Sequence, residues 1–389
     1  MVESLSTAES SGGAQVEYRS LGRTGLRVSA LGLGTEYLIN LPREHVVSVV
    51  HDAIARGINY FDLFFAQPAF RDNAGAAFRG YREKVLLTAH LGSVDRDGQY
   101  DKSRNPAEAG PYFADYLTRY QTDHVDVLFI HNIDEQADYD RVMGPGGLLE
   151  MAKTLRGEGK ARAIGFSGHT AATAMQAVLS GQVDVLMFPI NLAGHAMPGK
   201  KELFSACAER GVGLVAMKPF AGGRLLREDR TLVFNKVQVA GTPREIERKA
   251  WITPSQCLAY VHAQPGVSTV VPGCKDREQL AAAVVALTAS EAEKDFAPVM
   301  ADFAQYVEGE CVYCNHCLPC PSYIDIGRTM RLLDSVVVRP TPKQLRAYKA
   351  QSPSPADCIE CGACSERCPF GVDPMNKVEE TAALFEALL

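Results

Sequence analysis

The sequence lacks several features that would define its class at once. Its 389 residues contain no apolar run long enough to span a bilayer, so we expect neither membrane insertion nor a membrane partner. The net charge is -6 and Lys and Arg form no cluster, which argues against a nucleic-acid partner. The N-terminus has no basic or apolar signal region. We therefore expect residues 1–16 to be a disordered tail and the protein to be cytoplasmic.

Cysteine is scarce in most of the chain and abundant near its end. Eight of the eleven cysteines fall within residues 311–368. In a cytoplasmic chain of this size, clustered cysteines indicate metal binding more often than disulfides. The change in composition predicts one domain over residues 17–300 and a second over residues 301–389. The other three cysteines resemble ordinary buried residues and are Cys207, Cys257 and Cys274.

The first predicted domain alternates short apolar runs with longer stretches. In stretches such as EHVVSVVHDAIARG, apolar residues recur at helical spacing and a Gly follows, as at many helix ends. Eight strands, each followed by a helix, predict an α/β fold, a parallel (β/α)₈ TIM barrel. A doubly wound open sheet is the alternative. The candidate strands are residues 30–35, 59–63, 85–90, 125–131, 163–167, 183–190, 212–218 and 268–272.

Five motifs follow one another over residues 18–287: YRSLGRTGLRVSALGLGT, GINYFD, DVLFIHN, GFSGH and VVPGCKDREQL. In this order and spacing they resemble the aldo/keto reductase family. The resemblance implies a barrel that binds NADPH across the C-terminal ends of its strands and passes the hydride to a carbonyl. It also implies a Tyr that donates the proton, a Lys paired with an Asp that adjusts the acidity of this Tyr, and a His that orients the substrate.

The catalytic positions implied by this resemblance are only half matched. They place the Asp at Asp62 and the His at His131, but the Tyr position holds Gln67 and the Lys position holds His90. An amide is no useful proton donor, and loss of a general acid costs about 10² to 10⁴ in rate. We hypothesise that His90, paired with Asp62, is the acid or base instead.

The nucleotide site implied by the resemblance is also only partly present. One of the three positions expected to hold the nicotinamide carboxamide is Met187, which cannot form the required hydrogen bonds. The turn PGCKDREQ opens a helix with backbone N–H groups and two cations, which suit the phosphate of NADP. The alternative is that these cations are solvated side chains on a surface turn. The candidate cofactor-binding residues are Ser167, Asn191, Lys218, Gly273, Lys275 and Arg277.

Four histidines fall at the predicted C-terminal ends of consecutive strands, the face that carries the active site in this fold. They are His90, His131, His169 and His195. We expect this polar mouth to hydrogen-bond a polar, oxygen-rich substrate, with His169 and His195 as substrate-binding residues. A divalent metal held by two or three of the histidines is the alternative.

The cysteine runs are CVYCNHCLPCP and CIECGACSERCP. The second matches the bacterial ferredoxin pattern, in which three thiolates wrap one [4Fe-4S] cluster and the fourth reaches a partner cluster. This pattern predicts two [4Fe-4S] clusters, and structural zinc is the alternative. Helical stretches at residues 326–333, 343–350 and 374–388 predict a mostly helical ferredoxin-like domain. The expected ligands are Cys311, Cys314, Cys317 and Cys368 for one cluster and Cys358, Cys361, Cys364 and Cys320 for the other.

Together these features predict an oxidoreductase for a small polar carbonyl or alcohol, with NADP as a candidate cofactor. Its clusters would exchange electrons with a redox partner protein, because a hydride carries two electrons and each cluster accepts one. Two other functions stay open. The barrel could perform a non-redox isomerisation or elimination, or it could serve an electron carrier as a docking platform.

Overall fold

The computed structural model describes residues 16–195, 199–221, 224–226, 252–297, 299, 317, 320–334, 336, 339–368 and 372–389. Residues 1–15, the predicted domain boundary, Cys311 and Cys314 lie outside this part of the chain. Within it, no helix has the length and apolar character needed to cross a membrane.

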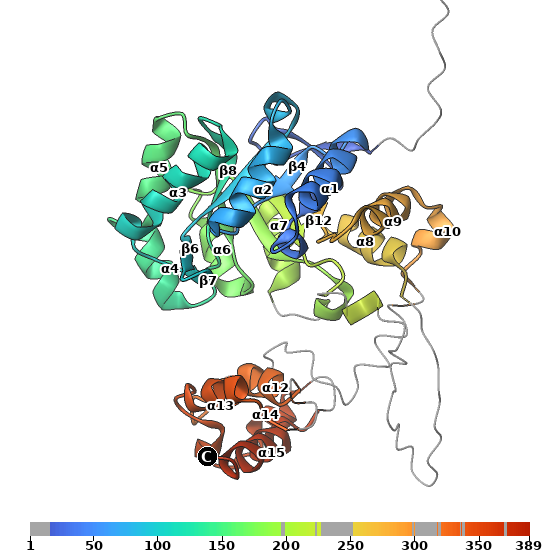
Figure 1. The fold of residues 1–389 in the computed structure, drawn as a ribbon. Coiled ribbons are helices and arrows are strands. Elements are labelled where there is room, and N and C mark those ends of the chain that lie inside the picture. Colours follow the sequence, from blue (N-terminus) through green and yellow to red (C-terminus); the bar gives the residue numbers. More distant parts are fainter. Residues whose placement is uncertain are drawn as a thin grey trace, which may run out of the picture.

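Within the described residues, eight parallel strands of the first domain form one sheet (Figure 1). Two parallel bridges, Leu31 to Val270 and Gly34 to Gly273, join its two edges and close the barrel. The predicted (β/α)₈ barrel is therefore confirmed, and the doubly wound alternative is wrong. In order around the barrel the strands are β3 (Leu33–Gly34), β4 (Tyr60–Asp62), β5 (Leu86–Leu91), β8 (Val125–Ile130), β9 (Ala161–Ser167), β10 (Val185–Pro189), β11 (Gly213–Met217) and β12 (Val267–Val271).

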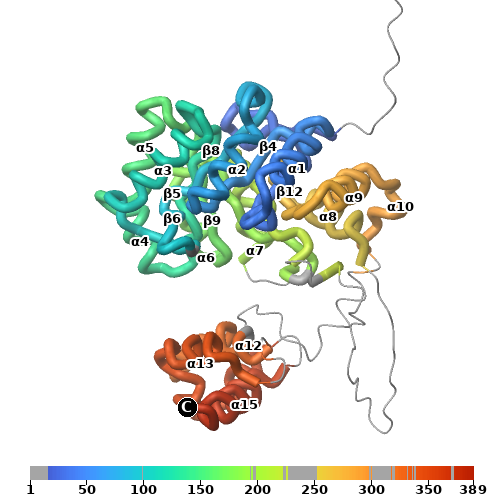
Figure 2. The backbone as a smooth tube through the Cα atoms, viewed as in Figure 1, coloured from blue at the N-terminus to red at the C-terminus, as the bar shows by residue number. Residues whose placement is uncertain are grey.

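Helices surround the strands and follow them in the chain, as Figure 2 shows. Their inward faces carry apolar residues at helical spacing. In α1, for example, Val46, Val49, Val50 and Ala53 are buried. The helices of the barrel are α1 (Arg43–Ala55), α2 (Pro68–Phe78), α3 (Pro106–Tyr120), α4 (Gln136–Met143), α5 (Leu148–Gly157), α6 (Ala171–Leu179), α7 (Lys200–Arg210), α8 (Pro254–His262), α9 (Arg277–Thr288) and α10 (Glu291–Lys294).

A short hairpin that the sequence analysis did not predict precedes the barrel. It pairs β1 (Tyr18–Ser20) with β2 (Arg27–Ser29). Leu21 and Leu26 from its turn are buried in one apolar cluster with Tyr60 and other residues that fill the barrel interior. The hairpin therefore covers the N-terminal end of the barrel, which in this fold is the face that serves stability.

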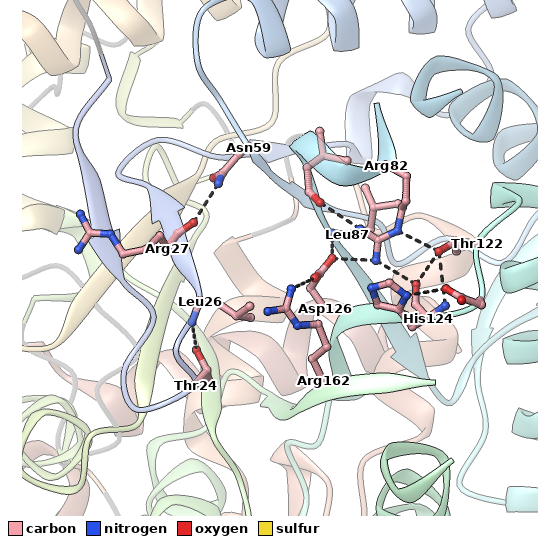
Figure 3. A network of polar contacts seen from close by, with 12 residues as sticks. Thr24, Leu26, Arg27, Asn59, Arg82, Leu87, Thr122, His124, Asp126 and Arg162 are labelled. Carbon is pink, nitrogen blue, oxygen red and sulfur yellow. Dashed lines mark hydrogen bonds and ion pairs between the residues drawn. The ribbon is translucent and has the colours of Figure 1, made fainter. Parts of the chain in front are cut away.

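A buried carboxylate holds two arginines near that same end of the barrel (Figure 3). Asp126 on β8 has a side chain that is only 1% exposed. It accepts hydrogen bonds from Arg82 at 3.0 Å, Arg162 at 2.9 Å and the backbone N–H of Leu87 at 2.9 Å. The carboxylate thus ties β8 to the neighbouring strands β5 and β9.

We expect Asp126→Ala to lower the free energy of unfolding by about 3 to 5 kcal/mol, because it leaves the part-buried Arg82 without its counter-charge. Chemical denaturation measured by circular dichroism checks this value. Asp123→Ala is the matched control, since the Asp123 side chain is 94% exposed and should change stability by less than about 0.5 kcal/mol. Equal effects of the two substitutions would contradict the prediction.

A second hairpin, also not predicted, lies between β5 and α3. It consists of β6 (Ser93–Arg96) and β7 (Gln99–Lys102), which pair so that Arg96 lies opposite Gln99. Asp97 and Gly98 form its two-residue turn with φ angles of 52° and 79°. Asp-Gly is favoured in such turns because both positions need positive φ. The hairpin extends from β5, whose C-terminal end carries His90.

The C-terminal module is mostly helical in its described residues, as predicted. Tyr348 and Phe385 stack with ring centroids 5.0 Å apart in one apolar cluster, and a second cluster surrounds Cys364. Cys317, Cys320, Cys358 and Cys368 pack against this second cluster. The helices are α12 (Ile326–Asp334), α13 (Pro342–Lys349), α14 (Ala363–Glu366) and α15 (Pro374–Glu386), and Figure 1 draws them in orange and red.

Candidate active site

Asp62 and His90 meet at the C-terminal ends of β4 and β5. The His90 Nε2 atom lies 2.8 Å from Asp62 Oδ1, and Thr88 donates a hydrogen bond to the same oxygen at 3.1 Å. Both side chains are nearly buried, with 2% of His90 and 9% of Asp62 exposed. The structure thus brings His90 and Asp62 into hydrogen-bond contact, and their acid–base role stays a prediction.

His131, directly after β8, extends this pair. Its Nδ1 atom lies 2.9 Å from His90 Nδ1, and its Nε2 atom lies 2.5 Å from the hydroxyl of Tyr100 on β7. Burial lowers the pKa of His131 well below its usual range, and the positive charge of Arg104 lowers it further. His131 is therefore neutral near pH 7. We call Asp62, His90, His131 and Tyr100 the acid–base chain.

The hydrogen bonds of the acid–base chain assign one tautomer to each histidine. A carboxylate only accepts, so His90 Nε2 carries the proton that bonds Asp62. In the neutral form of His90, Nδ1 is then an acceptor, and His131 Nδ1 donates to it. His131 Nε2 is left as an acceptor, and the Tyr100 hydroxyl donates to it. All three hydrogen bonds therefore point toward Asp62.

A second polar group lies across the mouth, at the ends of β9 and β11. Lys218 Nζ donates to His169 Nε2 at 2.8 Å, and His169 Nδ1 lies 3.1 Å from Asp134 Oδ2. The backbone N–H of His169 also donates to Asp134. Lys218 follows β11 directly and has a φ of 56°, in the left-handed region. The structure thus brings the predicted residues His169 and Lys218 into contact.

Glu36 is within electrostatic reach of both polar groups. It lies in the short helix η1 (Glu36–Leu38) after β3. Burial raises the pKa of Glu36, Lys218 opposes this rise, and Asp62 adds to it. The mouth therefore offers carboxyl, imidazole, phenol and ammonium groups, a set suited to a substrate with several oxygen atoms.

Two predicted site residues stand apart from these groups. Gln67 immediately precedes α2, and its Oε1 atom is buried with no hydrogen-bond partner. His195 follows the short helix η3 (Leu192–Gly194), and its Nδ1 atom lies 2.9 Å from the hydroxyl of Tyr260 on α8. His195 thus bonds a helix of the barrel wall, and its substrate-binding role stays a prediction.

The ring nitrogens that a metal would need at His90 and His131 already have hydrogen-bond partners. Both ring nitrogens of His90 and of His131 are within hydrogen-bond distance of other side chains. Among the described residues, no group of three or more His, Cys, Asp or Glu side chains is placed to hold a single metal ion. A metal at these histidines would have to replace the hydrogen bonds between them.

The residues predicted for the nicotinamide are engaged within the protein. Asn191 donates to the Lys218 carbonyl at 3.0 Å and accepts from Gly194 N–H at 2.9 Å. Ser167 accepts from the N–H of Asn132 at 2.9 Å. The carboxamide of a nicotinamide could bond Ser167 and Asn191 only by replacing these hydrogen bonds within the protein. This end of the predicted nucleotide site therefore fits NADP only in part.

The phosphate end of the predicted nucleotide site is more open. The Lys275 and Arg277 side chains are 62% and 61% exposed at the start of α9, and Arg277 lies 3.5 Å from Asp52. Gly273 lies beside the ring of Tyr37, where a Cβ atom would come within 2.5 Å of a ring carbon. The two cations suit a phosphate, although Asp52 partly neutralises one of them.

In the C-terminal module, four predicted cluster ligands line one cavity. They are Cys320, Cys358, Cys361 and Cys364, and apolar side chains such as Ile324 and Ile326 complete its wall. The cavity matches the ligand set expected for one of the two clusters. For the other set, Cys311 and Cys314 lie outside the described residues, while Cys317 and Cys368 pack at the edge of the same apolar cluster.

The sequence analysis missed Tyr100, Thr88 and Asp134, which complete the two polar groups. Tyr100 could have been found, because the Asp-Gly pair at residues 97–98 is a strong hairpin signal and would have placed Tyr100 on a strand that turns back toward β5. Thr88 and Asp134 carry no comparable signal.

A closed barrel with acid–base residues at the C-terminal ends of its strands defines a (β/α)₈ enzyme. The model of the aldo/keto reductase family matches residues 30–300, and that of a 4Fe-4S dicluster domain matches residues 310–373. The chain therefore belongs to the aldo/keto reductase family, a family of oxidoreductases, and carries a C-terminal 4Fe-4S dicluster domain. Both predictions from the sequence motifs are confirmed.

Individual relatives agree with this assignment. The uncharacterized oxidoreductase YqkF of Bacillus subtilis (strain 168) is 24% identical over 281 residues, which are 67% of this chain and 88% of YqkF. Two solved structures share the fold. The aldo-keto reductase AKR11C1 from Bacillus halodurans has a TM-score of 0.58 at 21% identity, covering 75% of this chain and 96% of its own. The putative aldo-keto reductase PA4992 from Pseudomonas aeruginosa has a TM-score of 0.53 at 23% identity, covering 69% and 95%.

Proposed function

We propose that the protein interconverts a small polar alcohol and its carbonyl at the C-terminal face of the barrel. The observation that carries this proposal is the buried series of hydrogen bonds from Asp62 through His90 to His131, which lies where enzymes of this fold have their active sites. A buried carboxylate that orients two imidazoles is suited to moving a proton to or from a substrate oxygen.

The proposal changes the role expected for His90. Both of its ring nitrogens are bonded, to Asp62 and to His131, and only 2% of its side chain is exposed. His90 therefore acts through His131 and is a positioning and proton-transfer residue. The group formed by Lys218, His169 and Asp134 holds further oxygen atoms of the substrate. Gln67, at the family's Tyr position, can offer a substrate only the acceptor Oε1 or the amide donor.

NADP is the proposed hydride carrier, held by Lys275 and Arg277 at its phosphate and by Ser167 and Asn191 at its carboxamide. When bound, it would supply or accept the hydride that the side chains cannot. The C-terminal module holds two [4Fe-4S] clusters in this proposal, and they exchange single electrons with a redox partner protein.

Anaerobic titration with NADPH tests the nucleotide. We expect saturable binding, and a dissociation constant about tenfold or more higher in the Lys275→Glu, Arg277→Glu double variant, which places two anions against the phosphate. Arg79→Glu is the matched control, because Arg79 is an exposed arginine at the end of α2, outside the predicted site. A panel of polyols and aldoses is then assayed with NADP⁺ and NADPH.

Each outcome bears on one part of the proposal. Absence of saturable NADPH binding to the wild-type protein would overturn the NADP linkage. If a polyol from the panel still raised the melting temperature, a non-redox acid–base reaction at the same mouth would replace it. Bleaching of the cluster absorbance by NADPH would support electron transfer between the barrel and the clusters.

A further inference from the structure

One member of the acid–base chain is much more exposed than the others. Counted over the whole residue, main chain included, only 8% of His90 and 5% of His131 is exposed, and their ring nitrogens are all bonded. Tyr100, at the other end from Asp62, is 36% exposed. Any proton that passes between a substrate and Asp62 along these hydrogen bonds therefore passes through the Tyr100 hydroxyl.

We propose that Tyr100 is the catalytic phenol of this enzyme, and that it relays the substrate's hydroxyl proton through His131 and His90 to Asp62. The inference deepens the proposed function, on which it rests for the substrate alcohol. The position where the family expects a Tyr holds Gln67. A phenol from a different element, the β6–β7 hairpin, thus supplies the missing group.

Neighbouring elements hold the Tyr100 ring and its hairpin by contacts on several sides. Phe64 and Phe65 meet the ring edge-on, with centroids 5.7 and 6.0 Å away. Tyr112 on α3 donates to the carbonyl of Asp95, which lies opposite Tyr100 in the hairpin, at 2.5 Å. Ser93 donates to the Phe64 carbonyl at the hairpin's base. The hydroxyl of Tyr100 is therefore fixed in place, as a proton-transfer group requires.

Arg104 holds the backbone of His131, the partner of Tyr100 in this hydrogen bond. It donates to the carbonyls of His131 and Asn132 at 2.8 and 2.7 Å, and it forms an ion pair with Asp138 at 2.9 Å. These bonds orient the backbone that carries the His131 ring toward Tyr100. They also place a positive charge near the phenol, which partly offsets the effect of burial on its pKa.

The direction of the hydrogen bonds determines the direction of the relay. The substrate O–H breaks as Tyr100 Oη takes its proton, and the proton of Tyr100 moves to His131 Nε2. The proton on His131 Nδ1 moves to His90 Nδ1, and that on His90 Nε2 moves to the Asp62 carboxylate. One proton enters at the mouth, one arrives on Asp62, and the substrate oxygen is left as an alkoxide. Carbonyl reduction runs the same steps in reverse.

This relay needs no free phenolate. Burial raises the pKa of Tyr100, opposed by a hydrogen bond from Asn132 and the charge of Arg104, so the phenol is protonated at neutral pH. A hydroxyl that accepts one proton as it gives up another stays neutral throughout. The residue can therefore act without the nearby Lys that the family uses to adjust the acidity of its Tyr.

The test uses the full protein with its clusters, labelled with ¹⁵N-histidine. We expect His131 in the Nδ1–H tautomer and His90 in the Nε2–H tautomer. Tyr100→Phe keeps the ring contacts and removes only the hydroxyl, and it should slow hydrogen exchange of the His90 Nε2–H with solvent about tenfold or more, because exchange then requires opening of the buried site. Tyr112→Phe is the matched control, since it removes a phenol that supports the hairpin without touching His131.

An Nε2–H tautomer for His131 would overturn the proposal, as would unchanged exchange in Tyr100→Phe. With an alcohol turned over by the wild type, Tyr100→Phe should also lower kcat about 10²- to 10⁴-fold, while KM changes far less. A purely structural role would instead give Tyr112→Phe the same loss. If no alcohol is turned over but exchange slows as expected, the proposed function fails while the relay itself stands.

Discussion

Replacing Asp62 by Asn is expected to lower kcat for the alcohol substrate about 10²- to 10⁴-fold. The carboxylate is the only group in the acid–base chain that must be an acceptor, and every tautomer follows from it. An amide carries no charge and can donate as well as accept. The amide of Asn therefore does not stabilise a proton that arrives at residue 62. Because the amide can also donate to His90 Nε2, His90 can adopt the opposite tautomer, and the Tyr100 hydroxyl need no longer be the donor to His131.

Steady-state kinetics of Asp62→Asn and of a control check this expectation. Asp184→Asn is a suitable control, because Asp184 is a carboxylate before β10, at the opposite end of the barrel, where it bonds Arg23 and Arg156. It should leave kcat within about threefold of the wild-type value, since the N-terminal face serves stability. A kcat for Asp62→Asn close to that of the control would exclude Asp62 from proton transfer.

The barrel could be predicted because each of its strands and helices carries its own hydrophobic pattern in the sequence. Strands covered on both faces read as unbroken apolar runs, and β8, with the sequence VDVLFI, is buried at every position. The two hairpins escaped prediction because β1 and β6 span only three and four residues and expose part of their surface. Runs this short carry too little hydrophobic pattern to stand out from a loop.

The site was predictable where topology alone decides position. The C-terminal ends of neighbouring parallel strands converge, which is why Asp62, His90 and His131 lie together as expected. His195 follows a strand in the same way, but a short helix turns its ring toward Tyr260 on α8. The final direction of a side chain in a loop depends on tertiary contacts that the sequence does not display.

The same limit applies to the family comparison. Matching positions one by one finds Gln67 where a Tyr is expected and leaves the acid–base set incomplete. The structure shows a phenol reaching His131 from the β6–β7 hairpin, between β5 and α3. A match made position by position therefore misses a side chain that reaches the site from another element.

Replacing Cys364 by Ala is expected to remove one iron-sulfur cluster and about half of the iron bound per chain. Cys364 lies in the first turn of α14 and is 9% exposed. It lines the same cavity as Cys320, Cys358 and Cys361. Loss of one thiolate leaves the cluster three ligands and an opening beside Cys364. Apolar side chains surround the cavity, so the empty site would also destabilise the module.

Iron and acid-labile sulfide per chain, and the electron paramagnetic resonance of the reduced protein, measure this loss. Cys274→Ala is the matched control, because burial raises the pKa of the Cys274 thiol to about 12 and keeps it protonated, whereas an iron ligand must be a thiolate. The control should retain all of its iron. Retention of all iron by Cys364→Ala would contradict the assignment of Cys364. Loss of both clusters would instead show that the two are held as one cooperative unit, since each cysteine run is predicted to contribute a ligand to both.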